Sequence, residues 1–137
     1  MAKAPPDWAR EFVAQARVGR LATAGAQADP HVIPICFVLL ENRVCSVIDE
    51  KPKTGRKLKR LRNIAATGQA ALVVDHYEED WTRLAYVLMR GPARVVPVTS
   101  EVLTALRAKY PQYNAMSLAA AEMVELTVES WTAWRGE

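Results

Sequence analysis

The sequence predicts an α+β fold built around a small antiparallel β-barrel. About six strand-like runs follow one another, most of them at hairpin spacing, which is the pattern that closes economically as a small barrel. Helical patterns occur only at the start, after the third strand and before the last strand. With 137 residues, of which 50% are hydrophobic and 24% charged, the chain is long enough for one globular domain over residues 1–137.

The first part of the chain predicts one helix and three strands. Residues 5–16 begin with proline and place Trp8, Phe12 and Val13 on one side, as expected for a helix that packs on a core. Pro34 interrupts the second strand and predicts an edge strand or a bulge, because proline cannot donate a ladder hydrogen bond. The predicted strands cover residues 17–24, 31–40 and 43–48, the last two joined by a turn at Glu41 and Asn42.

The second part predicts three strands and a further helix. Residues 69–77 read as a buried strand and residues 84–98 as a long strand, with a bend expected at Gly91 and Pro92. Residues 100–109 predict a helix capped by Ser100, and residues 110–114 predict a loop. The segment 119–134 begins as helical or irregular chain and ends as an amphipathic strand.

A cationic stretch interrupts this pattern between the third and fourth strands. Seven Lys and Arg residues fall within residues 51–62, with no carboxylate among them. An apolar stripe predicts a helix here, with Thr54 as its N-cap and Gly68 as its C-cap. The stripe consists of Leu58, Leu61, Ile64 and Ala65, and the cations are Lys51, Lys53, Arg56, Lys57, Lys59, Arg60 and Arg62.

Helix geometry aligns several polar side chains of this stretch in a second stripe, with Lys57 at the edge of the apolar face. A helix N-terminus with free amide donors and flanking cations is a suitable phosphate site. Two alternatives remain open, a solvated basic face and a nucleic-acid contact, although no stacking aromatic residues alternate with the cations. The members of the second stripe are Lys53, Arg56, Arg60 and Asn63.

The two cysteines lie in apolar strand-like runs and are expected to be buried. A two-residue turn at residues 41–42 would pair Cys36 with Val47 and Cys45 with Val38, so the thiols would be diagonal neighbours. With no CxxC motif, neither a disulfide nor a metal site is expected. No apolar run reaches the roughly 18 residues of a membrane helix, and the N-terminus has no signal-peptide core, so a cytoplasmic location without a membrane contact is expected.

Four segments of the chain resemble one superfamily when they are taken together. The sequence GRLAT at residues 19–23, the strand 31–40, the basic helix 51–64 and the segment VDHYEEDW at 74–81 are similar to the split β-barrel flavin and deazaflavin oxidoreductases. These are the pyridoxamine 5′-phosphate oxidase-like proteins, and the chain is most similar to their coenzyme F420-dependent branch. The resemblance covers residues 8–98.

The resemblance implies a six-stranded antiparallel split β-barrel with flanking helices, assembled as a homodimer with the cofactor in a groove between subunits. It assigns the cofactor phosphate to cations of the basic loop and helix and the ring system to two strand segments. The implied phosphate residues are Lys53, Lys57 and Arg60, with Arg56 and Asn63 nearby. The residues that would flank the ring are His31, Val32, Ile33, Pro34, Ser46, Val47 and Ile48.

The implied function is transfer of a hydride from reduced coenzyme F420 to a small conjugated or quinone-like acceptor. An FMN-dependent oxidoreductase and a non-catalytic binder of flavin, haem or another tetrapyrrole are the alternatives. No catalytic side chain is assigned, because hydride transfer depends on placement of the carrier. The chain lacks the C-terminal Arg-x-His motif of true pyridoxamine-phosphate oxidases, so that substrate is not expected. Candidates to border the acceptor, or simply to pack, are His76, Tyr77, Trp81 and Tyr86.

Overall fold

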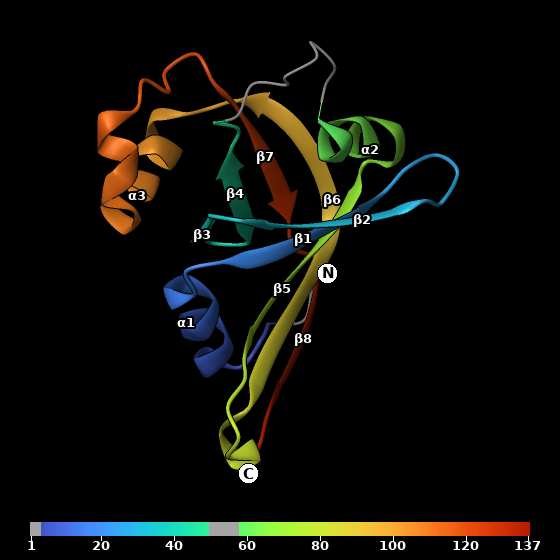
Figure 1. Ribbon diagram of the computed structural model, residues 1–137, viewed down its shortest axis with the longest axis vertical. Coiled ribbons are helices and arrows are strands. Elements are labelled where there is room, and N and C mark those ends of the chain that lie inside the picture. The colour runs from blue at the N-terminus through green and yellow to red at the C-terminus, as the bar shows by residue number, and fades with distance from the viewer. Residues whose placement is uncertain (1–3, 50–57) are drawn as a thin grey trace.

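The computed structural model describes residues 4–49 and 58–137 and confirms an antiparallel α+β split barrel (Figure 1). In these two ranges, no helix combines the length and the apolar character needed to span a membrane. The helices are α1 (Asp7–Gln15), α2 (Lys59–Thr67) and α3 (Ser100–Lys109), with 3-10 turns η1 (Trp81–Arg83) and η2 (Pro111–Ala115). The strands are β1 (Gly19–Ala24), β2 (Pro30–Ile35), β3 (Val38–Leu40), β4 (Arg43–Val47), β5 (Gln69–His76), β6 (Ala85–Pro97), β7 (Glu122–Thr127) and β8 (Ser130–Arg135).

The strands form one antiparallel sheet in the order β2-β1-β5-β6-β7-β4-β3, and β8 also pairs with β6. The two ends of this order, β2 and β3, are separated in the chain only by Cys36 and Phe37. The Ser46 hydroxyl donates a 2.8 Å hydrogen bond to the Cys36 carbonyl, which links this junction to β4. Pro34 lies in β2, at the sheet edge, as its missing N–H predicts.

Strand β6 belongs to both parts of the sheet. Residues 85–92 pair with β5 along one edge and residues 85–90 pair with β8 along the other, whereas residues 93–97 pair with β7. The predicted bend at Gly91 and Pro92 coincides with this change of partner, and β6 is a curved strand in Figure 1. A Cβ atom on Gly91 would lie 1.9 Å from the Thr127 carbonyl oxygen, so the crossing requires glycine.

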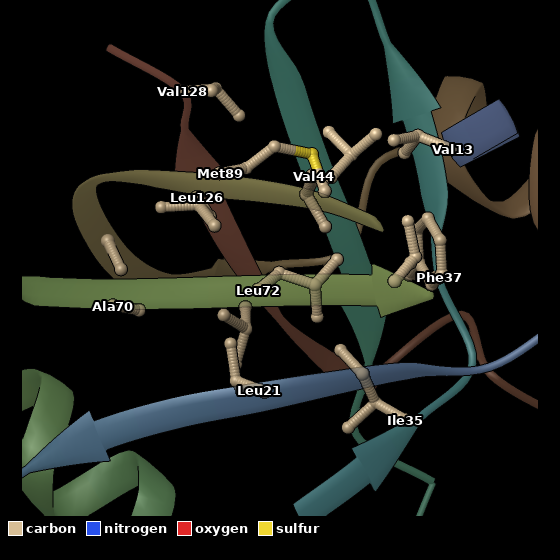
Figure 2. Packing of buried hydrophobic residues seen from close by; sticks show 14 of the residues in the cluster. Val13, Leu21, Ile35, Phe37, Val44, Ala70, Leu72, Met89, Leu126 and Val128 are labelled. Carbon is tan, nitrogen blue, oxygen red and sulfur yellow. The ribbon is translucent and has the colours of Figure 1, made fainter. Parts of the chain in front are cut away.

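The barrel interior holds the main hydrophobic cluster (Figure 2). Leu21, Leu72 and Met89 occupy one cross-strand row and are at most 1% exposed. Burial of each such side chain stabilises the folded state by about 1.5–3 kcal/mol. A second cluster lies under α3, whose Val102 and Leu106 are fully buried, so the helix covers the β3-β4-β7 side of the sheet.

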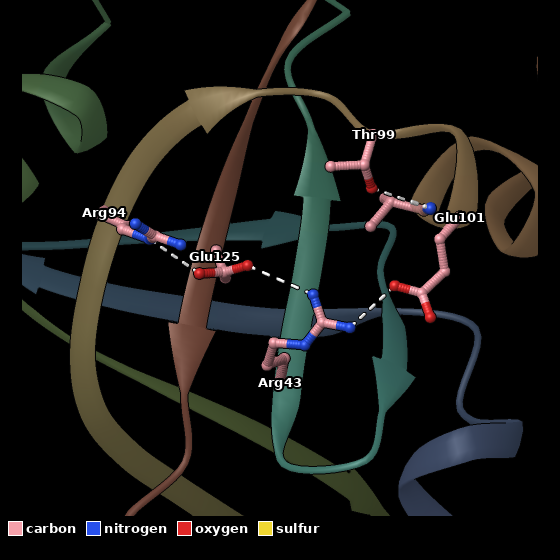
Figure 3. A network of polar contacts seen from close by, with 6 residues as sticks. Arg43, Arg94, Thr99, Glu101 and Glu125 are labelled. Carbon is pink, nitrogen blue, oxygen red and sulfur yellow. Dashed lines mark hydrogen bonds and ion pairs between the residues drawn. The ribbon is translucent and has the colours of Figure 1, made fainter.

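A charged network crosses the outside of β4, β7 and β6 (Figure 3). Glu125 is 7% exposed and accepts hydrogen bonds from Arg94 at 2.8 Å and from Arg43 at 3.4 Å. Arg43 also donates to Glu101 of α3 at 2.9 Å. The buried carboxylate is therefore paired on both sides, as a buried charge requires.

The described residues contain eight strands, not the expected six. The single strand expected over residues 31–40 is divided at Cys36 and Phe37, where the chain leaves β1 and joins β4. The C-terminal strand is divided at Val128 and Glu129, because these amides bond to Asn42 and Arg90 and redirect the chain from β4 to β6.

Several local predictions were wrong. The N-cap of α2 is Leu58, which has extended dihedral angles, so the helix begins at Lys59; Thr54, the expected cap, lies outside the described residues. Ala65, expected on the apolar stripe, is exposed. The N-cap of α3 is Thr99 and not Ser100, because the Thr99 hydroxyl accepts from the Val102 amide at 3.3 Å.

The prediction for the cysteines was half correct. Cys45 is buried and pairs with Val38, as the two-residue turn implies. Cys36 is exposed, because β2 ends at Ile35 and the chain turns before β3 begins.

We expect Gly91→Ala to lower the free energy of unfolding by at least about 2 kcal/mol, because the new methyl group meets backbone that no rotamer change can move away. Urea unfolding measures this effect. Gly68→Asn is the matched control: Gly68 has φ +67° and no atom within 4 Å of the place where a Cβ atom would lie, and asparagine tolerates this conformation, so the cost stays below about 1 kcal/mol. Equal losses in the two variants would contradict the crossing constraint.

Candidate functional site

Polar contacts fasten α2 to the hairpin formed by β1 and β2. Lys59 pairs with Asp29 in the hairpin loop, and this contact lowers the pKa of the Asp29 carboxyl. Asn63, 1% exposed, donates a 3.0 Å hydrogen bond to the Thr23 hydroxyl. A Cβ on Gly25 would lie 2.6 Å from an Asp29 carboxylate oxygen and 3.0 Å from the Asn63 amide oxygen, so glycine leaves room for this cluster. The basic helix therefore has a fixed position on the sheet.

This position brings Arg60 into a pocket of about 190 Å³, which we call the Arg60 pocket. Arg60 is in the first turn of α2 and is 8% exposed. The walls come from the end of β2, the end of β4 and the 3-10 turn η2. The other lining residues are Pro34, Ile35, Cys36, Ser46, Val47, Asp49 and Tyr113.

The Arg60 pocket offers hydrogen-bond donors to an anion. Arg60 already makes an interaction within the protein, but a guanidinium carries five N–H donors, so an added phosphate contact is compatible with it. Burial, and then the charge of Asp49, raises the pKa of Tyr113, so its hydroxyl remains protonated at neutral pH. The Ser46 hydroxyl already donates its hydrogen to the Cys36 carbonyl, so it can only accept a further hydrogen bond and offers no donor to an anion. Asp49 is the one lining carboxylate among the described residues, and its charge opposes that of an anion.

Lys109 and Tyr110 hold η2 against the junction between β2 and β3. The Lys109 ammonium donates to the Phe37 carbonyl at 2.9 Å and lies 4.0 Å from the centre of the Phe37 ring. The Tyr110 hydroxyl accepts from the Phe37 amide at 3.2 Å, and its ring packs edge-on against Tyr113. Burial, and then the charge of Arg17, lowers the pKa of Lys109 to about 8. This cluster positions Tyr113 beside the Arg60 pocket.

The structure brings some of the predicted cofactor residues together and separates others. Four of them line the Arg60 pocket: Pro34, Ser46, Val47 and Arg60. Asn63 does not line it; its hydrogen bond to Thr23 holds α2 on the β1–β2 hairpin. Lys53, Arg56 and Lys57 lie outside the described residues.

The remaining strand residues have mixed environments. Ile33 and Ile48 pack against the main core, and Val32 is 61% exposed on the edge strand. His31 is partly buried, and its Nδ1 has no hydrogen-bond partner within the described ranges.

The four candidate acceptor residues lie at the opposite end of the molecule from the Arg60 pocket. His76 ends β5, about 23 Å along the strand from Gln69, which follows α2. Trp81 belongs to η1 at the bottom of Figure 1, whereas α2 is near the top. Tyr77, Trp81 and Tyr86 are 60%, 67% and 37% exposed. Within this chain, these side chains therefore do not reach the Arg60 pocket.

Sequence reasoning missed Tyr113 and Lys109. Tyr113 was expected in a loop, and its neighbours Cys36 and Arg60 lie far away in the sequence. A local signal was present only in the proline that begins η2. Hydrophobic periodicity reports on local structure, so it cannot predict that Tyr113 meets residues so distant in the sequence.

Comparison with known proteins gives a family and a partial relative. The family model described as pyridoxamine 5′-phosphate oxidase matches residues 6–135. Over 83 residues, the chain is 35% identical to a 5a,11a-dehydrotetracycline/5a,11a-dehydrooxytetracycline reductase from Streptomyces rimosus. This match covers 58% of the chain and 55% of the reductase, so the chain spans about half of that relative.

Solved structures share the fold at low sequence identity. An F420 reductase superposes with a TM-score of 0.68 at 18% identity, with 93% of this chain and 98% of that one covered. The haem storage protein HutZ from Vibrio cholerae superposes with a TM-score of 0.69 at 16% identity, with 93% of each chain covered. At these identities, the likeness concerns the fold alone.

We expect Lys109 to make the free energy of unfolding rise as pH increases from about 8 to 10.5. In this window the unfolded chain, where the lysine pKa is near 10.5, binds more protons than the folded protein, where it is about 8. Urea titrations at pH 7 and pH 9 should therefore show that wild type gains stability relative to Lys109→Met.

The comparison with Lys109→Met is necessary because Cys45 acts in the opposite direction. Burial raises the pKa of Cys45 from 9.0 to about 11, so its contribution is lost as pH rises through that range. Both proteins contain Cys45, and the difference between them cancels its effect. If the difference in free energy of unfolding between wild type and Lys109→Met did not change with pH, the lowered pKa assigned to Lys109 would be contradicted.

Proposed function

We propose, from the premise that this chain belongs to the pyridoxamine 5′-phosphate oxidase family, that it is an oxidoreductase dependent on coenzyme F420. Its acceptor would be a small conjugated or quinone-like molecule. The partial relative named as a dehydrotetracycline reductase and the structural neighbour named as an F420 reductase support reduction as the reaction class.

The observation that carries the proposal is the buried guanidinium of Arg60 at the first turn of α2. Charged hydrogen bonds from arginine and the positive end of a helix both favour a phosphate group. Tyr113 also lines the Arg60 pocket, and its raised pKa keeps its hydroxyl protonated, so it would be a neutral donor. A deazaflavin cofactor has a phosphate and an acidic tail, and the donors of this pocket fit the phosphate. The cations Lys53, Arg56 and Lys57 are predicted to hold the rest of the anionic portion.

The size of the Arg60 pocket limits what it can hold. A volume of about 190 Å³ is below the roughly 300–1,000 Å³ of sites that enclose a drug-sized ligand. The phosphate would therefore enter the pocket, while the flat ring system would extend along the edge strand β2. Val32 and Pro34 are exposed there and offer apolar surface to a ring. When bound, the deazaflavin supplies the hydride, and the role of the chain is to hold it at a fixed distance from the acceptor.

The outer face of the sheet supports a homodimer. Residues on this face stay partly or fully exposed, whereas the inward side chains in the middle of β5 and β6 are buried. One row across the strands contains Val73, Leu88 and Thr132, and a second contains Tyr86 and Trp134, whose rings are 6.2 Å apart. We propose that this face packs against a second copy. A partner would cover the exposed aromatic residues and could enclose the ring that the Arg60 pocket is too small to hold.

The cofactor is identified by titration. If the proposal holds, the purified protein is colourless and quenches the fluorescence of added F420, and reduced F420 is oxidised only when an acceptor is present. A yellow protein with a flavin absorbance band would instead favour FMN. Binding of haem without any oxidation of reduced F420 would favour a non-catalytic binder.

We expect Arg60→Ala to weaken F420 binding by on the order of 1–3 kcal/mol, because a charge-assisted hydrogen bond is lost. Lys57→Ala should have a similar effect. Arg62 is exposed on the same helix and provides the matched control, so Arg62→Ala should bind with nearly unchanged affinity. Equal affinities in wild type and Arg60→Ala would remove the Arg60 pocket as the phosphate site.

We expect the wild-type protein to sediment as a dimer and Val73→Glu as a monomer, because the variant adds a charge to the centre of the proposed interface. Analytical ultracentrifugation at micromolar concentration measures this difference. Thr104→Glu changes an exposed position on α3 and should remain dimeric. A monomeric wild type would contradict the proposed use of this face.

A further inference from the structure

A second hollow, of about 450 Å³, lies between α1 and the ends of β5, β6 and β8. It shares no lining residue with the Arg60 pocket. Its volume falls within the roughly 300–1,000 Å³ typical of small-molecule sites. The lining comes from α1, from η1 with the residues around it, and from the three strand ends, and each of these elements belongs to the described part of the chain.

The floor of the hollow is a row across three strands. His76 pairs with Ala85, and Ala85 pairs with Arg135, so the three side chains share one face of the sheet. Alternation along β6 puts this row on the same face as the fully buried Val87. The hollow therefore continues the inner face of the barrel, opposite to the proposed dimer face. Ala85 leaves open the space that a larger side chain would fill between its two neighbours.

Aromatic residues of α1 form the wall above this row. Trp8 and Phe12 contact each other edge to face, with ring centroids 6.1 Å apart. The Arg135 guanidinium lies 4.8 Å from the centre of the Trp8 ring. Stacking of this kind fixes the plane of the guanidinium while its N–H groups remain directed outward from its edge.

The Arg135 guanidinium is the group of this hollow that can bind an anion. Glu78 accepts hydrogen bonds from both His76, at 2.8 Å, and Arg83, at 3.0 Å, so this carboxylate balances the charge of Arg83. Arg135 has no carboxylate or hydrogen-bond partner for its guanidinium among residues 4–49 and 58–137. The only carboxylate that lines the hollow within these ranges is Glu11.

We propose that this hollow binds a planar aromatic carboxylate. The ring would lie over Ala85 against Trp8 and Phe12, and the carboxylate would form a two-pronged hydrogen bond with Arg135. The aromatic wall selects a flat apolar body, and the Arg135 guanidinium selects the acid over a neutral analogue. This site does not depend on the cofactor assignment, because no residue of the Arg60 pocket contributes to it.

The test uses 2-naphthoate and its neutral counterpart 2-naphthamide as probes, with binding to the full chain measured by isothermal titration calorimetry without added cofactor. We expect saturable binding of the acid and affinity for the amide lower by about 10-fold or more, as the loss of a charge-assisted hydrogen bond implies. Arg135→Met should weaken naphthoate binding by about 10-fold and leave naphthamide binding nearly unchanged.

Two further variants separate this site from nonspecific attraction. Ala85→Leu should weaken both probes, because the added side chain occupies the floor. Arg90 is an exposed residue of β6, the strand of Ala85, but on the opposite face of the sheet. Arg90→Met should therefore bind both probes as wild type does. Thermal melting verifies that each variant is folded. Absence of saturable naphthoate binding at millimolar concentration, or equal naphthoate affinity in wild type and Arg135→Met, would overturn the proposal.

Discussion

Strand β6 is shared by both parts of the sheet, and the rest of the structure depends on this sharing. Its first part lies between β5 and β8, and its last part pairs with β7, so one continuous backbone connects the two curved surfaces of the barrel. The crossing is possible only because Gly91 has no side chain where the Thr127 carbonyl approaches. Met89 on one side of this point and Val95 on the other both pack in the main core.

The Arg60 pocket depends on polar contacts that lie outside it. A buried guanidinium is costly to desolvate, so its position must be enforced by the surrounding structure. Lys59 and Asn63 of α2 supply this constraint through Asp29 and Thr23 of the β1–β2 hairpin. On the other wall, Lys109 and Tyr110 fix η2 through the backbone of the β2–β3 junction. The proposed phosphate contacts therefore come from elements that are far apart in sequence but are each held to the same edge of the barrel.

The sequence predicted the antiparallel α+β barrel because alternation of apolar and polar residues reports directly on strands with one buried face. It did not reveal the break at Cys36 and Phe37, since both residues suit a strand and only the register with β1 and β4 shows where pairing changes. Thr99 and Ser100 are adjacent hydroxyl residues, and only backbone geometry decides which one caps α3. For the candidate site, Arg60 could be predicted from its place in a basic helix. Tyr113 was not, because its contribution depends on tertiary packing that local patterns do not encode.

The sharing of β6 also governs how the protein opens to solvent. Because every residue in the first part of β6 is paired on both edges, its amide hydrogens become accessible only when β5 or β8 separates from it. Opening of the β7 side would in turn withdraw Gly91 from its contact and disturb the same strand. Neither side of the barrel is then an independent cooperative unit, and hydrogen exchange in residues 85–90 would require separation of a neighbouring strand and not fraying of β6 itself.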